Sequence, residues 1–160
     1  MMKHSLTKLL CLAAALCLLL GGCSAPADSG SAAFDPEAAT QAVLDSGAFS
    51  VELTELDAAL LYDFSGYGLD SSTLTASKAY SASGFAEQVS VTVWKDEAAA
   101  QAAVDMFKTY LEDMAATYKD YAPAEVPKLE NAVLELRGSS VLLAVANDAG
   151  AAKTAVDGLK

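Results

Sequence analysis

A repeated pattern of strand, strand and helix constrains the fold of this 160-residue chain. With an offset of 52 residues, segment 93–107 aligns without gaps to segment 145–159, and seven of the fifteen aligned positions are identical. Any strand followed by an aspartate cap and an alanine-rich helix gives a similar match, so a duplication and a chance likeness both remain open. Either origin predicts the same architecture, in which two hairpins are each followed by a helix.

Alternating apolar residues predict four strands in two pairs. The strands are expected at residues 74–82, 89–93, 132–136 and 141–146. Asp96 and Asp148 have the position and chemistry of helix N-caps, and the helix after Asp96 is expected to reach about Tyr118. The predicted fold class is α+β, with a four-stranded, mainly antiparallel sheet from two strand-strand-helix units and the helices packed on one face.

An N-terminal helical segment is expected to join this sheet. Asp35-Pro36-Glu37 is a typical helix start and predicts a helix to about Ser46, which Gly47 ends. A second short helix is predicted over residues 54–62, capped by Thr54, followed by a loop over residues 63–72.

Two prolines shape the segment between the long helix and the second strand pair. Pro123 and Pro127 are expected to hold residues 121–131 out of helix, because proline lacks a backbone N–H and restricts the residue before it.

The first 22 residues have the order of parts of a bacterial lipoprotein signal peptide. A basic head and an apolar stretch precede two glycines and Cys23, whose thiol would receive the lipid. The alternatives are an uncleaved transmembrane helix and a secretory signal cut without lipidation. Residues 9–22 are too few for the first, since a helix needs about 20 residues to cross a bilayer core. We therefore expect a protein anchored through Cys23 at the extracytoplasmic face of the cell membrane.

The expected domain organisation follows from this cleavage. Residues 1–22 form the signal peptide, residues 23–33 contain the lipidated cysteine and a flexible tether, and residues 34–160 form a single globular domain.

Cleavage would also remove the side chains that many active sites use. Cys11, Cys17 and His4 lie in the signal peptide, so the mature chain would have neither imidazole nor free thiol. This argues against Ser-His-Asp and Cys-His catalysis and against zinc sites built on His or Cys. The mature chain would carry a net charge of −13, from 8 basic and 21 acidic residues. We expect no catalytic residue, no cofactor, no metal site and no nucleic-acid partner.

Five residues are candidates for interaction sites. Lys78 is expected at a sheet edge, in the same strand phase as Tyr80, where its charge would prevent sheet-to-sheet association. Glu87 is expected to form a cross-strand ion pair with Lys78. Trp94 is predicted on the phase opposite the strand valines, exposed to a sugar or a partner. Tyr121 is the fifth candidate and belongs to a tyrosine cluster near the end of the long helix.

That cluster also contains Tyr110 and Tyr118. Core packing with hydroxyl groups that reach water is the favoured interpretation of these rings. A ligand cage is the alternative.

A set of residues in the second half of the chain supports a family resemblance. The set is Tyr121, Pro123, Lys128, Leu129, Gly138 and Asp148, with Glu87 before the strand 89–93. In this pattern the chain resembles a family of small lipoproteins from Gram-positive, clostridia-like bacteria, catalogued as domain of unknown function 4358. The resemblance covers roughly residues 34–159 and implies a lipid-anchored envelope domain, but it implies no reaction.

Three functions remain for such a chain. The first is a non-enzymatic module that binds or scaffolds an envelope protein or a cell-wall component at the membrane surface. The second is a carboxylate-based cell-wall hydrolase, which would need two facing acids and a raised pKa. The third is a small solute-binding lipoprotein.

Overall fold

The structure of the protein, a computed structural model, describes residues 32–160. The predicted signal peptide, Cys23 and most of the predicted tether lie outside the described residues. Within residues 32–160, no helix combines the length and the apolar character that a membrane span requires.

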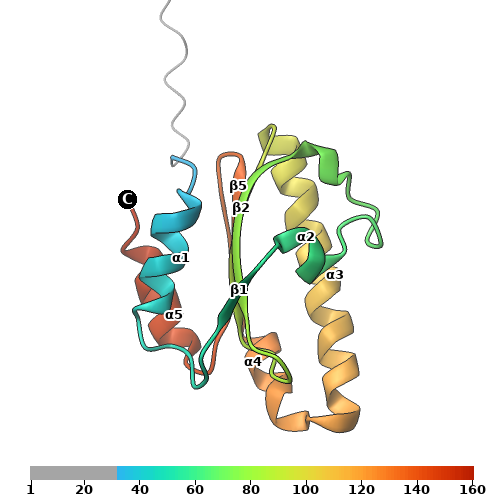
Figure 1. The fold of residues 1–160 in the computed structure, drawn as a ribbon, viewed down its shortest axis with the longest axis vertical. Coiled ribbons are helices and arrows are strands. Elements are labelled where there is room, and N and C mark those ends of the chain that lie inside the picture. Colours follow the sequence, from blue (N-terminus) through green and yellow to red (C-terminus); the bar gives the residue numbers. More distant parts are fainter. Residues whose placement is uncertain (1–31) are drawn as a thin grey trace, which may run out of the picture.

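Five strands within the described residues form one antiparallel sheet, in the order β1-β2-β3-β5-β4 (Figure 1). Their bounds are Thr54–Leu56 for β1, Leu74–Ser81 for β2, Gln88–Trp94 for β3, Val133–Arg137 for β4 and Ser140–Val145 for β5. The predicted α+β class and both predicted hairpins are confirmed. The sheet has one strand more than predicted, because the short β1 pairs with the outer side of β2.

Helical segments connect and cover the strands (Figure 1). The α-helices are α1 (Pro36–Leu44), α2 (Ala58–Tyr62), α3 (Glu97–Tyr121), α4 (Val126–Glu130) and α5 (Ala149–Asp157), and the 3-10 turns are η1 (Ser71–Thr73) and η2 (Pro123–Glu125). An aspartate caps α1, α2, η1, α3 and α5, with its side chain accepting from backbone N–H groups of the first turn. The predicted caps Asp96 and Asp148 are confirmed.

The prediction of a helix over residues 54–62 is wrong at its start. Thr54 lies in β1, opposite Ser81, and does not cap a helix. Asp57 is the cap instead, because its carboxylate accepts a hydrogen bond from the Ala59 N–H at 2.7 Å.

The segment 121–131 also differs from its prediction, since η2 and α4 make much of it helical. Pro123 and Pro127 lie in the first turns of these two helical segments. In a first turn the backbone N–H has no partner within the helix, so proline causes no loss there.

Helices cover both faces of the sheet (Figure 1). The side chains of Val141, Leu143 and Val145 pack in one core with residues of α2 and α3. Leu142 and Ala144, on the other face of β5, pack in a second core with residues of α1 and α5. The two helices of the repeated units, α3 and α5, therefore lie on opposite faces, whereas the sequence predicted both on one.

Different segments of the chain pack at the two ends of the sheet. At the end with the β4–β5 turn, the Phe34 N–H donates to Ser140 Oγ at 2.8 Å. The Arg137 guanidinium lies 4.4 Å from the centre of the Phe34 ring. It donates to the carbonyl of Val156, in the last turn of α5, and to that of Leu159 just after the helix. The turn between β2 and β3 lies at the other end, beside α4 (Figure 1).

Candidate functional site

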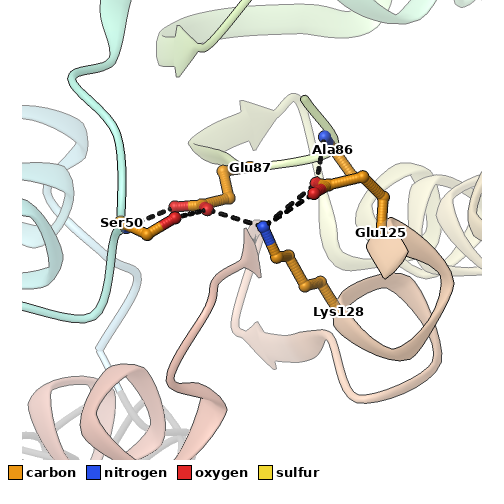
Figure 2. A network of polar contacts seen from close by, with 5 residues as sticks. All are labelled: Ser50, Ala86, Glu87, Glu125 and Lys128. Carbon is orange, nitrogen blue, oxygen red and sulfur yellow. Dashed lines mark hydrogen bonds and ion pairs between the residues drawn. The ribbon is translucent and has the colours of Figure 1, made fainter. Parts of the chain in front are cut away.

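A buried ion network lies at the β2–β3 end of the sheet (Figure 2). Its centre is Glu87, whose side chain is 0% exposed. One carboxylate oxygen of Glu87 lies 2.8 Å from Lys128 Nζ, and the other accepts from the Ser50 N–H at 2.7 Å. The Ser50 hydroxyl donates to the same carboxylate.

Glu125 completes the network from the other side of Lys128 (Figure 2). Its carboxylate lies 2.9 Å from Lys128 Nζ and accepts from the Ala86 N–H, also at 2.9 Å. The Lys128 side chain is 13% exposed and bridges two carboxylates. The network thus ties together the segment after α1, the β2–β3 turn and the η2–α4 segment, and its three ionised groups carry a net charge of −1.

The network keeps its central groups ionised. Burial alone would raise the pKa of Glu87, but its hydrogen bonds from Lys128 and Ser50 lower the pKa below the usual value. Burial would lower the pKa of Lys128, but the carboxylates of Glu87 and Glu125 raise it above the usual value. A general acid needs a raised pKa. A carboxylate whose pKa is lowered, as that of Glu87 is, is suited to an ion pair instead.

We expect this pairing to appear in the pH dependence of stability. The ionised form of Glu87 stabilises the folded state above its unfolded pKa, near 4.5, and this contribution is lost as the pH falls through the lower folded pKa. The free energy of unfolding should therefore decrease on acidification below about pH 4.5, and less steeply in Glu87→Gln.

Urea unfolding measured from pH 7 to pH 3 tests this expectation. The control is Asp157→Asn, at the exposed Lys153–Asp157 pair, which should keep the wild-type slope. Equal slopes for wild type and Glu87→Gln would contradict the role given to Glu87.

A cavity of about 240 Å³ adjoins the network. Its walls come from α2, α3, α4 and the β2–β3 turn, and include Leu61, Phe85, Gln88, Tyr110, Met114 and Tyr118. At its wall, the buried Gln88 amide and the Tyr110 hydroxyl form a hydrogen bond of 3.2 Å. No charged side chain is among the described residues that line this cavity. The described lining is therefore uncharged, and combines aromatic and aliphatic side chains with a few neutral polar groups.

The predicted ion pair between Lys78 and Glu87 is wrong. Lys78 Nζ lies 2.9 Å from Glu55 and 3.1 Å from Glu37. The added strand β1 places Glu55 beside β2, so Lys78 is not on an outer strand. Its two partners come from β1 and from α1. Glu87 precedes β3 and pairs with α4 instead.

Tyr80 belongs with Lys78, away from the buried network. Its hydroxyl lies 3.4 Å from Glu55 Oε2, and Lys78 Nζ lies 5.6 Å from the centre of its ring. These three residues form a cluster on β1 and β2.

The predicted exposure of Trp94 is wrong, because its side chain is 1% exposed. The sequence suggested one buried face for β3, but α3 covers the second face as well. The ring of Trp94 packs edge-on against Phe64 at 5.3 Å, and its indole N–H donates to Thr92 Oγ1 at 3.0 Å. It has no surface to offer a ligand.

The tyrosines near the end of α3 divide into two kinds. Tyr110 and Tyr118 are buried, as expected for core packing, and both line the cavity. Tyr121 is 62% exposed, with its ring centre 4.9 Å from that of Tyr118. Of the five predicted interaction residues, the structure places Glu87 in the network and Tyr121 next to the cavity wall.

Sequence reasoning missed Ser50 and Glu125 as partners of Glu87 and Lys128. The i, i+3 spacing of Glu125 and Lys128 is a signal for an ion pair within one helix, but the two prolines hid the helix. Glu87, Lys128 and Leu129, which support the family resemblance, meet at the network and the cavity.

Comparison with known proteins gives a family and no further relative. No curated protein and no solved structure matches the chain. A family model described as a domain of unknown function (DUF4358) matches residues 46–146. The matched region contains the ion network and all five strands, and it covers more than half of the chain. The protein therefore belongs to the DUF4358 family.

Proposed function

We propose that this protein is a non-enzymatic binding module, held by a lipid on Cys23 at the extracytoplasmic face of the cell membrane. The cavity between α2, α3, α4 and the β2–β3 turn would be its binding site. The main observation in support of this proposal is that the cavity lies directly beside the buried ion network. Ala86 and Leu129 both line the cavity, and each adjoins a network residue in the chain. The network holds the cavity walls in place, which reduces the ordering that binding requires.

The state of the carboxylates supports binding over hydrolysis. Hydrolysis of a glycosidic bond by two carboxylates needs one protonated acid near neutral pH. Glu87 has a lowered pKa, and Lys128 lies between it and Glu125. These acids are arranged to stabilise the fold.

The position of Phe34 supports the proposed arrangement at the membrane. Phe34 is fixed at the β4–β5 end of the sheet, and the cavity lies at the opposite end, beyond the length of β3. The seven residues of β3 span about 20 Å. The tether, at most about 33 Å long, would therefore join the domain at the end opposite the cavity and leave the cavity free to contact the cell wall or other envelope proteins.

The anchor is tested by Cys23→Ala. We expect the wild-type protein in the membrane fraction and the variant almost entirely in the soluble or secreted fraction, because the variant lacks the thiol that would carry the lipid. Fractionation with immunoblotting measures the ratio. Retention of Cys23→Ala at the membrane would show that the proposed anchor is wrong.

The binding site is tested by photo-crosslinking in intact cells. A photoreactive residue at position 85, at the cavity, is compared with one at position 136, on β4. Phe85 and Leu136 are both partly exposed apolar side chains, so the two sites are matched. Crosslinks that form only from position 85 support the site. Identical products from both positions, or none from position 85, would contradict it.

A further inference from the structure

We infer that the cavity binds a positively charged aliphatic ammonium group. This inference rests on the proposed function and names the ligand chemistry of the same site. Three features of the cavity support it: its aromatic walls, the charge of the network beside it and the hydrogen-bond acceptors within it.

Aromatic rings line the cavity from two elements. Phe85 comes from the β2–β3 turn, and Tyr110 and Tyr118 come from α3. The face of an aromatic ring attracts cations, and several rings around one site are the usual means of holding an alkylated ammonium group. The Phe85 ring already has one cation contact, since Lys128 Nζ lies 6.0 Å from its centre.

The network next to the cavity has an excess of negative charge. Glu87 and Glu125 carry two negative charges against the single positive charge of Lys128. The Glu125 carboxylate accepts a hydrogen bond from the backbone N–H of Ala86, which lines the cavity. Both residues are buried, so water reaches this position poorly. Charge interactions extend further in such an environment than in water, so a cation in the cavity would be stabilised and an anion repelled. Neither lysine nor arginine is among the described lining residues.

The polar groups of the cavity suit a ligand that donates a hydrogen bond through an ammonium N–H or through a hydroxyl group near its ammonium. Gln88 Oε1 and the hydroxyl oxygens of Tyr110 and Tyr118 have lone pairs that can accept hydrogen bonds. Burial raises the pKa of both phenols, so they remain neutral at physiological pH. The volume of about 240 Å³ is below the range of about 300–1,000 Å³ typical of pockets for drug-sized ligands. A trimethylammonium group or an aminoalkyl chain is of suitable size.

Titration calorimetry on the full-length chain, purified from membranes in a non-ionic detergent, tests this inference. Choline is compared with its uncharged isostere, in which a tert-butyl group replaces trimethylammonium. We expect choline to bind roughly tenfold more tightly, because only the cation gains from the rings and the network. Nα-acetyl-lysine methylamide forms the second arm, and tighter binding of this probe would assign the ammonium to a polypeptide side chain instead of a small quaternary amine.

Variants locate the binding. Phe85→Leu keeps an apolar side chain but removes the ring, and should weaken binding of the preferred cation about fivefold or more. Leu136→Ala, on β4, should leave binding unchanged. Equal affinities for choline and its isostere, or no binding of any of the three probes, would overturn the ammonium inference. Crosslinking from position 85 tests the binding site without assuming any ligand. A negative result in the calorimetry would therefore contradict the ammonium inference and leave the proposed function to be judged by the crosslinking.

Discussion

Replacement of Lys128 by methionine should lower the free energy of unfolding by about 3–5 kcal/mol. Methionine has a similar length and keeps the apolar contacts of the side chain. It removes the only ammonium that contacts Glu87 and Glu125 in the described structure, and leaves two buried carboxylates without a counter-charge. Urea unfolding of the chain from Ser24 to Lys160, followed by circular dichroism, measures the change.

The control for this variant is Lys153→Met. Lys153 pairs with one acid, Asp157, and both side chains are more than half exposed. An exposed pair contributes about 0–1 kcal/mol, so this variant should unfold close to wild type. If Lys128→Met were no less stable than Lys153→Met, the buried network would not be a determinant of stability.

Trp94→Ala should destabilise the domain by about 3–5 kcal/mol. The indole ring is buried between α3 and the sheet. Its removal would leave a cavity beside Phe64 and would remove the N–H that donates to Thr92 Oγ1. Leu60→Ala is the matched control, because Leu60 is 82% exposed and should change stability by less than about 0.5 kcal/mol. Both variants are measured by urea unfolding with circular dichroism.

The wild-type protein offers an independent check of this burial. Trp94 is the only tryptophan in the chain. Fluorescence excited at about 295 nm, where tyrosine absorbs little, therefore reports this one side chain. We expect emission typical of an apolar environment in the folded state, and a red shift on unfolding. Solvent-like emission from the folded protein would contradict the position of Trp94.

The hairpins and helix caps could be predicted because their signals are local. The alternation of Val89, Val91 and Val93 indicates a strand without reference to the rest of the chain, and Asp96 and Asp148 cap helices through their own backbone neighbours. The second helical layer, on the other face of the sheet, has no such local signal in the sequence. In β3 and β5, nearly every residue is buried, and this continuous burial is typical of a strand between two helical layers.

The faces of the two repeated helices depend on the register between β3 and β5. Gln88 lies opposite Val145, and opposite residues in an antiparallel pair share a face. With this register, the offset of 52 places equivalent residues on opposite faces: Val91 lies opposite Leu142, whereas its repeat equivalent is Leu143. The sequence repeat shows no register, so it could not place α3 and α5.

The ion network was beyond sequence reasoning for a related reason. Glu87 and Lys128 are 41 residues apart and meet only because α4 folds back against the β2–β3 turn. The prolines in residues 123–127 suggested an irregular segment, so no direction could be assigned to the Lys128 side chain. The tyrosines were easier to interpret, because Tyr110 and Tyr118 repeat on one helical face.

The contact of Arg137 with both Phe34 and the C-terminal end of α5 has a practical consequence for labelling. Because this side chain joins the entry of the domain to its C-terminal helix, a fluorescent tag fused after Lys160 would emerge beside the attachment point of the tether. The opposite end of the sheet would stay accessible. Imaging and affinity capture can therefore use a C-terminal fusion without obstructing the aromatic cavity.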